Sequence, residues 1–280
     1  MDMYCVFGHP IEHSKSPWIH ARFAQLTGEA LQYSKTLVPL DGFASTVQAF
    51  QAGGGKGCNV TLPFKTEAAA LATRCSPRVS LAQACNTLKF DGQEVYGENT
   101  DGLGLVTDLV RNAGCALQGK SVLLIGAGGA AAGVLGPLLC EKPRLLYVAN
   151  RTLEKATHLV QRHAALAHAE GVDCQALNLQ HEALFSQSFE VVINASSSSL
   201  HQGELPVPAS VLSPQGLACD LMYGPAAQGF MQWAVAHGAQ ARDGLGMLVE
   251  QAAESFFVWR GVRPPTAPVL AELRALLAQA

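Results

Sequence analysis

Residues 121–131 read SVLLIGAGGAA, and this stretch decides the fold of the second half of the chain. The segment Ser121–Ile125 is leucine-rich and β-branched, which is typical of a buried strand, and Ala130–Leu139 has the alanine and leucine content of a helix. Between them, Gly126, Gly128 and Ala131 match G-x-G-x-x-G/A at a strand-to-helix turn. Such a turn lets the backbone approach a pyrophosphate, which the helix N-terminus attracts. We predict a dinucleotide site here; the alternative is that the glycines only shape the turn.

Strands and helices alternate beyond this turn. Strand patterns occur at Arg144–Val148, Glu190–Asn194 and Leu217–Asp220, and Leu153–Ala169 has a helical pattern. This alternation predicts a doubly wound, Rossmann-type α/β domain with a parallel sheet.

The cofactor is expected to be NADP(H). A domain that prefers NAD places Asp or Glu about 20 residues beyond the glycines, at the end of the second strand. Here Asn150, Arg151 and Thr152 occupy that place, and Lys155 follows one helical turn later. Arg151 can pair with a 2′-phosphate, which a carboxylate would repel. A solvated basic surface is the alternative interpretation.

Two hydroxyls in the first half predict an anion site. Ser14 and Ser16 follow the strand-like segment Tyr4–Phe7, and Pro17 suits the first position of a helix capped by Ser16. A helix N-terminus with two hydroxyls can bind an anion. The simpler interpretation is that Ser16 only caps the helix.

Lys65 and Asp101 are the candidate reactive side chains. Lys65 begins a predicted helix that runs toward Leu71, where the helix dipole disfavours a positive charge, as suits a proton-transfer group. Asp101 precedes an amphipathic helix, Leu103–Asn112. On their own, Lys65 could be a surface charge and Asp101 an N-cap.

Composition favours a globular enzyme with small ligands. The 280 residues are 49% hydrophobic and 15% charged, enough for two compact lobes. A net charge of −3 gives little support for a nucleic-acid partner. The N-terminal residues do not resemble a signal peptide, so we expect a cytoplasmic protein. The eight cysteines lack metal-ligand spacing and are expected to be reduced and mostly buried, with no metal site.

The uncharged stretch Val122–Cys140 approaches the length of a membrane span. Its glycines and Pro137 would weaken a membrane helix, whereas a strand, a turn and a helix account for them. We therefore expect no membrane segment.

An ordered set of motifs across essentially the whole chain closely resembles shikimate dehydrogenase. The set comprises Gly8, His13–Pro17, Asn59–Lys65, Asn86–Thr87, Asn99–Gly102, Gly126–Ala130, Asn150–Thr152, Gly246–Leu248 and Gln251. The resemblance implies reversible reduction of 3-dehydroshikimate to shikimate with NADPH, in aromatic amino-acid biosynthesis. It also implies that Lys65 and Asp101 flank the reacting oxygen, with Lys65 as the candidate acid. Which of the two formally carries the proton stays open, because a close pair titrates as a unit.

The resemblance implies the binding residues as well. Ser14 and Ser16 would bind the substrate carboxylate. The remaining substrate contacts would be Asn59, Thr61, Asn86, Gln251 and Tyr223. The cofactor contacts would be Gly126, Ala127, Gly128, Gly129, Ala130, Asn150, Arg151, Thr152, Lys155, Ser196, Gly244 and Met247, the last being equally acceptable as a core residue.

The chain departs from the family pattern at a few positions. Ala132 replaces a common arginine, Ser196 a frequent threonine, and Gln228–Gly229 the usual Thr-Pro, which puts the contact of Tyr223 with substrate in doubt. None of these changes removes a required reactive group.

The motifs divide the chain into two expected domains. Residues 1–101, completed by about 238–280, would form the substrate domain, and 102–237 the NADP-binding domain. A homodimer is a candidate assembly. Two alternatives stay open: a quinate/shikimate dehydrogenase with broader substrate or cofactor use, and a non-catalytic nucleotide-sensing relative.

Overall fold

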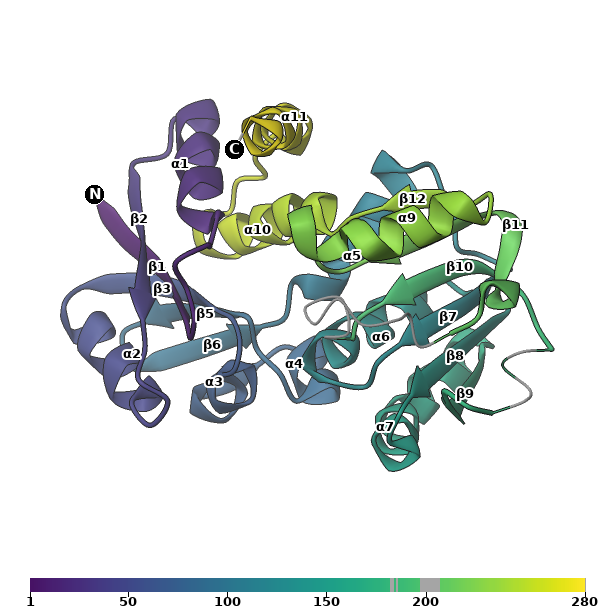
Figure 1. Cartoon of the computed structure of the whole chain (residues 1–280). Coiled ribbons are helices and arrows are strands. Elements are labelled where there is room, and N and C mark those ends of the chain that lie inside the picture. The colour runs from purple at the N-terminus through teal and green to yellow at the C-terminus, as the bar shows by residue number, and fades with distance from the viewer. Residues whose placement is uncertain (182–183, 185, 197–206, 280) are drawn as a thin grey trace. The chain divides into compact units, whose positions relative to one another are not determined.

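A computed structural model describes residues 1–181, 184, 186–196 and 207–279. The chain forms two compact units (Figure 1). The first unit comprises Met1–Gly104 and Leu248–Ala280, and the second is the continuous stretch Leu105–Met247.

The first unit contains a mixed six-stranded sheet with the order β2-β1-β3-β5-β6-β4. Its strands are β1 (Asp2–Gly8), β2 (Leu31–Leu37), β3 (Gly55–Val60), β4 (Arg74–Cys75), β5 (Thr87–Asp91) and β6 (Glu94–Glu98). β1 pairs in parallel with β2 and β3, whereas β5 runs antiparallel to β3 and β6. The start of β5 therefore lies beside the end of β3, and the end of β6 lies beside the start of β5.

Helices cover both faces of the first sheet. They are α1 (Ser16–Thr27), α2 (Phe43–Ala52), α3 (Lys65–Leu71), α4 (Pro77–Ala82), α10 (Leu245–Arg260) and α11 (Thr266–Ala278). α1, α10 and α11 lie on one face, and α2 and α3 on the other (Figure 1). β1 contributes core side chains to both faces of the sheet, because alternate side chains of a strand point to opposite sides. Cys5 and Phe7 thus join the core under α2 and α3, while Tyr4 stacks on Trp259 of α10.

Gly57 on β3 allows α10 to lie close to the first sheet. A Cβ at this position would come within 2.6 Å of Trp259 Nε1 and 2.5 Å of the Leu88 carbonyl oxygen. The same Trp259 Nε1 donates to that carbonyl at 2.9 Å. This hydrogen bond joins α10 to the N-terminal sheet, in agreement with the expected return of the C-terminal helices to the first domain.

The second unit is the doubly wound domain that the glycine motif predicts. Its sheet is parallel throughout the described strands, with the order β12-β11-β10-β7-β8-β9. The strands are β7 (Ser121–Ile125), β8 (Leu145–Asn150), β9 (Asp173–Asn178), β10 (Phe189–Asn194), β11 (Leu212–Asp220) and β12 (Gln240–Arg242). β7, at the centre, is buried at every position, in keeping with a strand covered on both faces.

Helices enclose the second sheet, with α6 (Gly129–Cys140) and α7 (Leu153–Glu170) on one face and α9 (Gln228–Ala236) on the other (Figure 1). Short helical turns lie at Ala209–Val211 and Gly224–Ala227. Strand order reverses between β7 and β10, and the glycine turn after β7 lies at this reversal. Ligands of open parallel sheets bind at such a point, outside the carboxyl ends of the strands.

The helix expected at Leu103–Asn112 differs in the structure. α5 (Asp101–Thr107) is followed by a π-helical turn, Asp108–Asn112. Asp108 is fully buried and accepts from Arg242 Nε at 2.7 Å and Arg242 Nη2 at 2.5 Å. The sequence periodicity does not reveal this long-range ion pair, which accompanies the widened turn.

The cysteines are free thiols, but the expectation that most are buried is wrong. Cys5, Cys58, Cys85 and Cys219 are buried, whereas Cys75, Cys115 and Cys174 are partly exposed and Cys140 is exposed. The last four lie on outer strands, at a helix end or in a loop, where hydrophobic composition alone does not determine burial.

None of the helices in the described ranges has the length and apolar character needed to cross a membrane. The stretch Val122–Cys140 instead forms β7, the glycine turn and α6.

Candidate active site and cofactor site

Lys65 and Asp101 form an ion pair in the first unit. Lys65 is the first residue of α3 and Asp101 the first residue of α5, and Lys65 Nζ donates to Asp101 Oδ2 at 2.5 Å. The two side chains are 16% and 8% exposed, so the pair is largely shielded from water. An amine and a carboxylate so close can exchange a proton with a bound substrate as one unit.

The second oxygen of Asp101 is also held. Asn86 Nδ2 donates to Asp101 Oδ1 at 2.8 Å, and the Asp101 backbone N–H donates to Asn99 Oδ1 at 3.1 Å. The Asp101 carboxylate is therefore oriented by both Lys65 and Asn86.

The Asn86 side chain is engaged on both of its polar atoms. Its Oδ1 accepts from Thr100 N at 2.9 Å and Thr87 Oγ1 at 3.0 Å. Besides Asp101, its Nδ2 contacts Thr100 Oγ1 at 2.9 Å and Gln251 Oε1 at 3.3 Å. The structure thus brings Lys65, Asp101, Asn86 and Gln251 together. Since an amide has only two N–H groups, the three acceptors around Nδ2 share them.

Asn59 lies in an adjoining network that the sequence did not reveal. Its Nδ2 donates to Thr87 Oγ1 at 3.1 Å and Ser255 Oγ at 3.0 Å, and its Oδ1 accepts from Tyr33 OH at 2.7 Å. Ser255 lies four residues beyond Gln251 on α10, a spacing that places both side chains on one face of the helix. This spacing could have identified Ser255 from the sequence. Burial raises the pKa of Tyr33 well above its usual range, so its hydroxyl remains a donor.

His20 lies beside this network with an unusual environment. Its ring stacks on Tyr33 at 4.2 Å and is fully buried, and both ring nitrogens lack a hydrogen-bond partner within the described part of the chain. Burial lowers the pKa of His20 to about 3, so the ring is neutral in the folded protein.

The predicted role of Ser16 as helix cap is wrong. α1 begins at Ser16 itself, with Lys15 at the N-cap position and no side-chain cap there. The hydroxyl that accepts the first N–H is that of Ser14, 3.3 Å from Ser16 N. Ser14 is partly exposed and Ser16 is 8% exposed, so two hydroxyls and the N-terminus of a twelve-residue helix lie together as a candidate anion site.

Thr61 lies where β1 ends, and this proximity explains a glycine in the motif set. A Cβ at Gly8 would lie 2.5 Å from Thr61 Cγ2, and Thr61 N donates to the Phe7 carbonyl at 2.9 Å. Only glycine at position 8 leaves room for Thr61.

The glycine turn of the second unit fits a phosphate. Gly126 has φ +110°, a region that favours glycine, and a Cβ there would come within 3.0 Å of the Ala195 backbone. Gly128, the N-cap of α6, and Gly129 would each carry a Cβ into open space. The protein's own packing therefore does not require glycine at these two positions, whereas close approach of a ligand to this turn would. The first N–H groups of α6 have no partners within the helix and suit an anion.

Arg151 and Lys155 lie on the exposed side of the turn after β8. β8 ends at Asn150, whose Nδ2 donates to the Thr152 carbonyl at 2.9 Å, and Asn178 Nδ2 donates to the Arg151 carbonyl at 3.1 Å. The backbone of the turn is fixed while the basic side chains remain exposed. The position suits the recognition of a 2′-phosphate.

Ser196 is oriented by a buried pair that sequence reasoning did not identify. Asn194 Oδ1 accepts from Ser196 Oγ at 2.7 Å, and Asn194 Nδ2 donates to Asp220 Oδ2 at 2.9 Å. Asn194 and Asp220 face each other at the carboxyl ends of β10 and β11. This pair could have been predicted, because Asn194 and Asp220 each end a strand that the sequence indicates.

Three further predicted residues belong to the second unit. Tyr223, a predicted substrate contact, precedes the turn Gly224–Ala227 and is partly buried. At Gly244, a Cβ would lie 2.2 Å from the Leu221 carbonyl oxygen, so this glycine is sterically required. Met247 is 9% exposed, which leaves both its core and its cofactor interpretation open.

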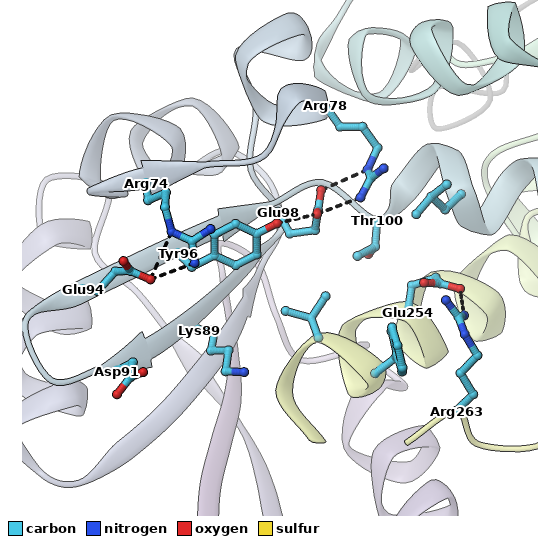
Figure 2. A pocket seen from close by; sticks show the side chains of 13 residues that line it. Arg74, Arg78, Lys89, Asp91, Glu94, Tyr96, Glu98, Thr100, Glu254 and Arg263 are labelled. Atoms are coloured by element: carbon cyan, nitrogen blue, oxygen red, sulfur yellow. Dashed lines mark hydrogen bonds and ion pairs between the residues drawn. The ribbon is translucent and has the colours of Figure 1, made fainter. Parts of the chain in front are cut away.

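A separate depression of about 530 Å³ lies in the first unit (Figure 2). Both acidic and basic side chains line it, and its lining includes Arg78, Glu98 and Thr100 but neither Lys65 nor Asp101. The depression therefore does not coincide with the reactive pair. Within the described ranges, no group of three or more His, Cys, Asp or Glu residues is placed to hold a metal ion.

Comparison with known protein families gives three matches along the chain. The shikimate dehydrogenase substrate binding domain matches residues 6–88, shikimate / quinate 5-dehydrogenase matches 108–202, and the shikimate 5′-dehydrogenase C-terminal domain matches 244–274.

Individual proteins are similar over nearly the full length. A shikimate dehydrogenase (NADP(+)) of Paracidovorax citrulli is 63% identical over 278 residues, covering 99% of this chain and 98% of the relative. The crystal structure of an Ael1 enzyme from Pseudomonas putida is 45% identical, covers 98% of each chain and superposes with a TM-score of 0.90. The shikimate 5-dehydrogenase of Thermus thermophilus in complex with NADP(H) and shikimate is 29% identical, with a TM-score of 0.85 over 98% of this chain and 99% of that one.

Proposed function

Because the chain belongs to the shikimate dehydrogenase family, we propose that it catalyses the reversible, NADPH-dependent reduction of 3-dehydroshikimate to shikimate, with Lys65 and Asp101 at the reacting oxygen. The chain is an NADP-dependent oxidoreductase of the shikimate pathway. The observation that carries the proposed site is the shielded Lys65–Asp101 pair, oriented by Asn86 among neutral donors and acceptors.

The residues of the second unit fit NADP(H). Open space above Gly128 and Gly129 and the N-terminus of α6 suit the pyrophosphate, while Arg151 and Lys155 suit the 2′-phosphate. The proposed contacts also include Ala127, Ala130, Asn150, Thr152, Ser196, Gly244 and Met247. When bound, NADPH supplies the hydride for the carbonyl carbon.

Substrate binding is assigned chiefly to the first unit. The hydroxyls of Ser14 and Ser16 at the start of α1 would receive the carboxylate. Asn59, Thr61, Asn86 and Gln251 would contact the ring hydroxyls, and Tyr223 is a further proposed contact. A polyhydroxylated acid needs one anion site and many neutral hydrogen-bonding groups, and these residues supply both.

The proton step is assigned to the Lys65–Asp101 pair. As the carbonyl oxygen gains negative charge, Lys65 Nζ donates a proton to it, and Asp101 holds the amine in position through its 2.5 Å contact. In the reverse direction the same pair accepts the proton of the alcohol.

The domain roles follow from these assignments. The unit Met1–Gly104 with Leu248–Ala280 would bind substrate, and Leu105–Met247 would hold NADP(H). The boundary expected near residue 238 lies at residue 247, because β12 (Gln240–Arg242) pairs with β11 in the second sheet. The family models for a substrate binding domain at 6–88 and for the region 108–202 support this division.

The deciding experiment measures initial rates of NADP⁺ reduction with shikimate and with quinate, and repeats both with NAD⁺. We expect shikimate with NADP⁺ to give the highest kcat/KM. Comparable turnover of quinate would favour the broader quinate/shikimate enzyme, and no turnover of either acid would favour the nucleotide-sensing alternative.

Arg151→Ser sharpens the cofactor part of the experiment. Loss of one charge-assisted contact should raise the KM for NADP⁺ about tenfold or more and leave the use of NAD⁺ nearly unchanged. An equal effect on both cofactors would mean that Arg151 acts on the fold of the turn.

The cellular location and the oligomeric state of the enzyme are also part of the proposed function. We place the enzyme in the cytoplasm on the grounds of its pathway, with shikimate and NADP(H) as its partners. A homodimer is the assembly to test, and sedimentation of the purified chain at several concentrations distinguishes it from a monomer.

A further inference from the structure

A buried carboxylate that has no part in the proposed chemistry lies two residues before Thr100 and three before Asp101. Glu98 ends β6, and its side chain is only 3% exposed, in the wall of the charged depression (Figure 2). A buried charge is costly unless it is paired and hydrogen-bonded, so the contacts of Glu98 indicate what it holds in place.

Five hydrogen bonds converge on the two oxygens of Glu98. Oε1 accepts from Ser76 Oγ at 2.6 Å, Asn99 N at 2.8 Å and Arg78 Nε at 3.1 Å. Oε2 accepts from Arg78 Nη2 at 2.8 Å and Tyr96 OH at 2.9 Å. The carboxylate is therefore fixed from α4, from β6 and from the loop that follows β6.

The contact with that loop leads to the reactive pair. Glu98 Oε1 holds the backbone N–H of Asn99, and the Asn99 side chain in turn accepts the backbone N–H of Asp101 at 3.1 Å. The main chain adds a second link, because Asn86 N donates to the Glu98 carbonyl at 3.1 Å and Asn86 Nδ2 donates to Asp101 Oδ1 at 2.8 Å. Both links begin at Glu98 and end on Asp101.

A second pair beside the same depression provides a comparison. Arg74 Nη2 contacts Glu94 Oε1 at 2.8 Å, as Arg78 contacts Glu98, but the Glu94 side chain is 45% exposed and Arg74 60% exposed. Glu94 of β6 pairs with Asp91 of β5, at the end of the strand remote from Asp101. The two pairs share their chemistry and differ in burial and in the link to Asp101.

We infer that Glu98 is a positioning residue for Asp101: its carboxylate, fixed by Ser76, Arg78 and Tyr96, sets the loop that aims the Asp101 carboxylate at Lys65. This inference rests on the proposed role of Asp101 in the reduction of 3-dehydroshikimate. Misplacement of a reacting group by about 1 Å can lower a rate by about 10²-fold, so a buried anchor of this kind has a kinetic consequence.

The experiment is a double-mutant cycle on kcat with Glu98→Gln and Asp101→Asn, and Glu94→Gln is the matched control. Glu98→Gln keeps the shape of the side chain but places an amide NH₂ group, itself a donor, against the hydrogen-bond donors that surround Glu98. We expect Glu98→Gln to lower kcat about 10- to 100-fold with the KM for NADP⁺ unchanged, and Glu94→Gln to stay within about twofold of the parent enzyme. In the Asp101→Asn background, Glu98→Gln should lower kcat less than about threefold, because residues that act through one another are not additive.

An equal loss in both backgrounds would show a structural role unrelated to Asp101, and no loss in the parent background would also overturn the inference. If Glu98→Gln does not fold, Tyr96→Phe tests the same link, since it removes one donor and keeps the carboxylate. Its effect on kcat should be smaller and should also disappear in the Asp101→Asn background. Since the parent enzyme is assayed in parallel, absence of shikimate turnover there would count against the proposed function, whereas an additive cycle on an active enzyme counts against Glu98 alone.

Discussion

The two proposed binding regions satisfy opposite requirements. Around Asp101 in the first unit, side chains from β5, α5 and α10 bind one another, and Asn86 uses both its amide N–H groups and its oxygen within the protein. Around Gly128 in the second unit, the backbone faces open space, and the nearby Arg151 is exposed. A site that must orient a proton donor is built from a satisfied side-chain network, while a site for a phosphate is built by leaving backbone uncovered.

The comparison predicts different responses to substitution. In the first region, removal of one functional group should alter the chemistry because its partners lose their orientation. In the second, addition of a methyl group should alter ligand binding because it fills the space that the ligand needs.

Lys65→Met gives the largest expected effect. It keeps most of the side-chain volume and removes the ammonium group, so kcat for shikimate oxidation should fall roughly 10²- to 10⁴-fold with a much smaller change in substrate affinity. Lys56→Met, at an exposed lysine of β3, is the control and should have near-normal kcat.

Combining Lys65→Met with Asp101→Asn tests whether the two residues act as a unit. The double variant should be little slower than the slower single one. A Lys65→Met enzyme with near-normal kcat would refute the mechanism and leave the NADP-binding fold intact.

Ser14→Ala together with Ser16→Ala tests the anion site of the same region. Each lost hydrogen bond to the substrate carboxylate should cost about 1.5–3 kcal/mol, so the KM for shikimate should rise by roughly a hundredfold or more. The KM for NADP⁺ should change less than about twofold. Ser45→Ala, at an exposed hydroxyl of α2, controls for the loss of a serine, and an unchanged KM for shikimate in the double variant would remove the assignment.

His20 tests how the first region tolerates an unpaired polar group. Its pKa in the folded state is about 3, below the unfolded value near 6.5, so the unfolded chain takes up the proton first. The stabilisation is fully present above about pH 6.5 and is lost as the pH falls toward 3. Between pH 7 and pH 5 the free energy of unfolding should decrease by about 2 kcal/mol from this group.

Urea unfolding of His20→Phe at the two pH values measures that contribution. The variant keeps a ring to stack on Tyr33 and should lose less stability on acidification than the parent protein, by about 2 kcal/mol. His158→Gln, at an exposed position of α7, is the control. Equal pH dependence of His20→Phe and the parent would mean that His20 is not neutral in the folded state.

Two glycine substitutions test the second region, where the backbone faces open space. Gly126→Ala introduces a Cβ at φ +110°, within 3.0 Å of Ala195, and should lower the free energy of unfolding by about 1–3 kcal/mol. Gly128→Ala meets no protein atom within 4 Å and should leave stability within about 0.5 kcal/mol of the parent.

The same Gly128→Ala enzyme should bind NADP⁺ about tenfold more weakly, because the methyl group fills the space of the pyrophosphate. Fluorescence titration measures the affinity. Normal affinity would mean that the open space at Gly128 is not used by the cofactor.

The sequence predicted the second unit well because its signals are local. Strand, turn and helix follow one another within Ser121–Leu139, and β7 has the bounds that its hydrophobic run indicates. The second sheet is parallel, as the alternation of strands and helices required. The family also followed from the sequence, since its motifs combine order and spacing along the chain.

The sequence predicted the contacts of the first unit less well because they join distant segments. Tyr33, Ser255 and Glu98 were not identified, although they hold the predicted residues Asn59 and Asp101 in place. A tyrosine on β2 or a serine on α10 has no local pattern that reveals a partner on another element. The predicted capping role of Ser16 was wrong because the local sequence allows the helix to begin at Ser16 or at Pro17. In the structure the helix begins at Ser16, and the Ser14 hydroxyl accepts the N–H of Ser16.

The discontinuous first unit sets an order of events on the ribosome. Phe256 and Trp259, which complete its core, are synthesised only after the whole of Leu105–Met247. At about 5–20 residues per second, that intervening stretch takes roughly 7–30 s to translate. During this interval the nascent N-terminal sheet lacks the C-terminal helices that help to cover one of its faces, whereas the second unit is continuous and can fold as soon as it emerges. The unit proposed to hold NADP(H) is therefore able to fold before the C-terminal helices complete the unit that contains Lys65 and Asp101.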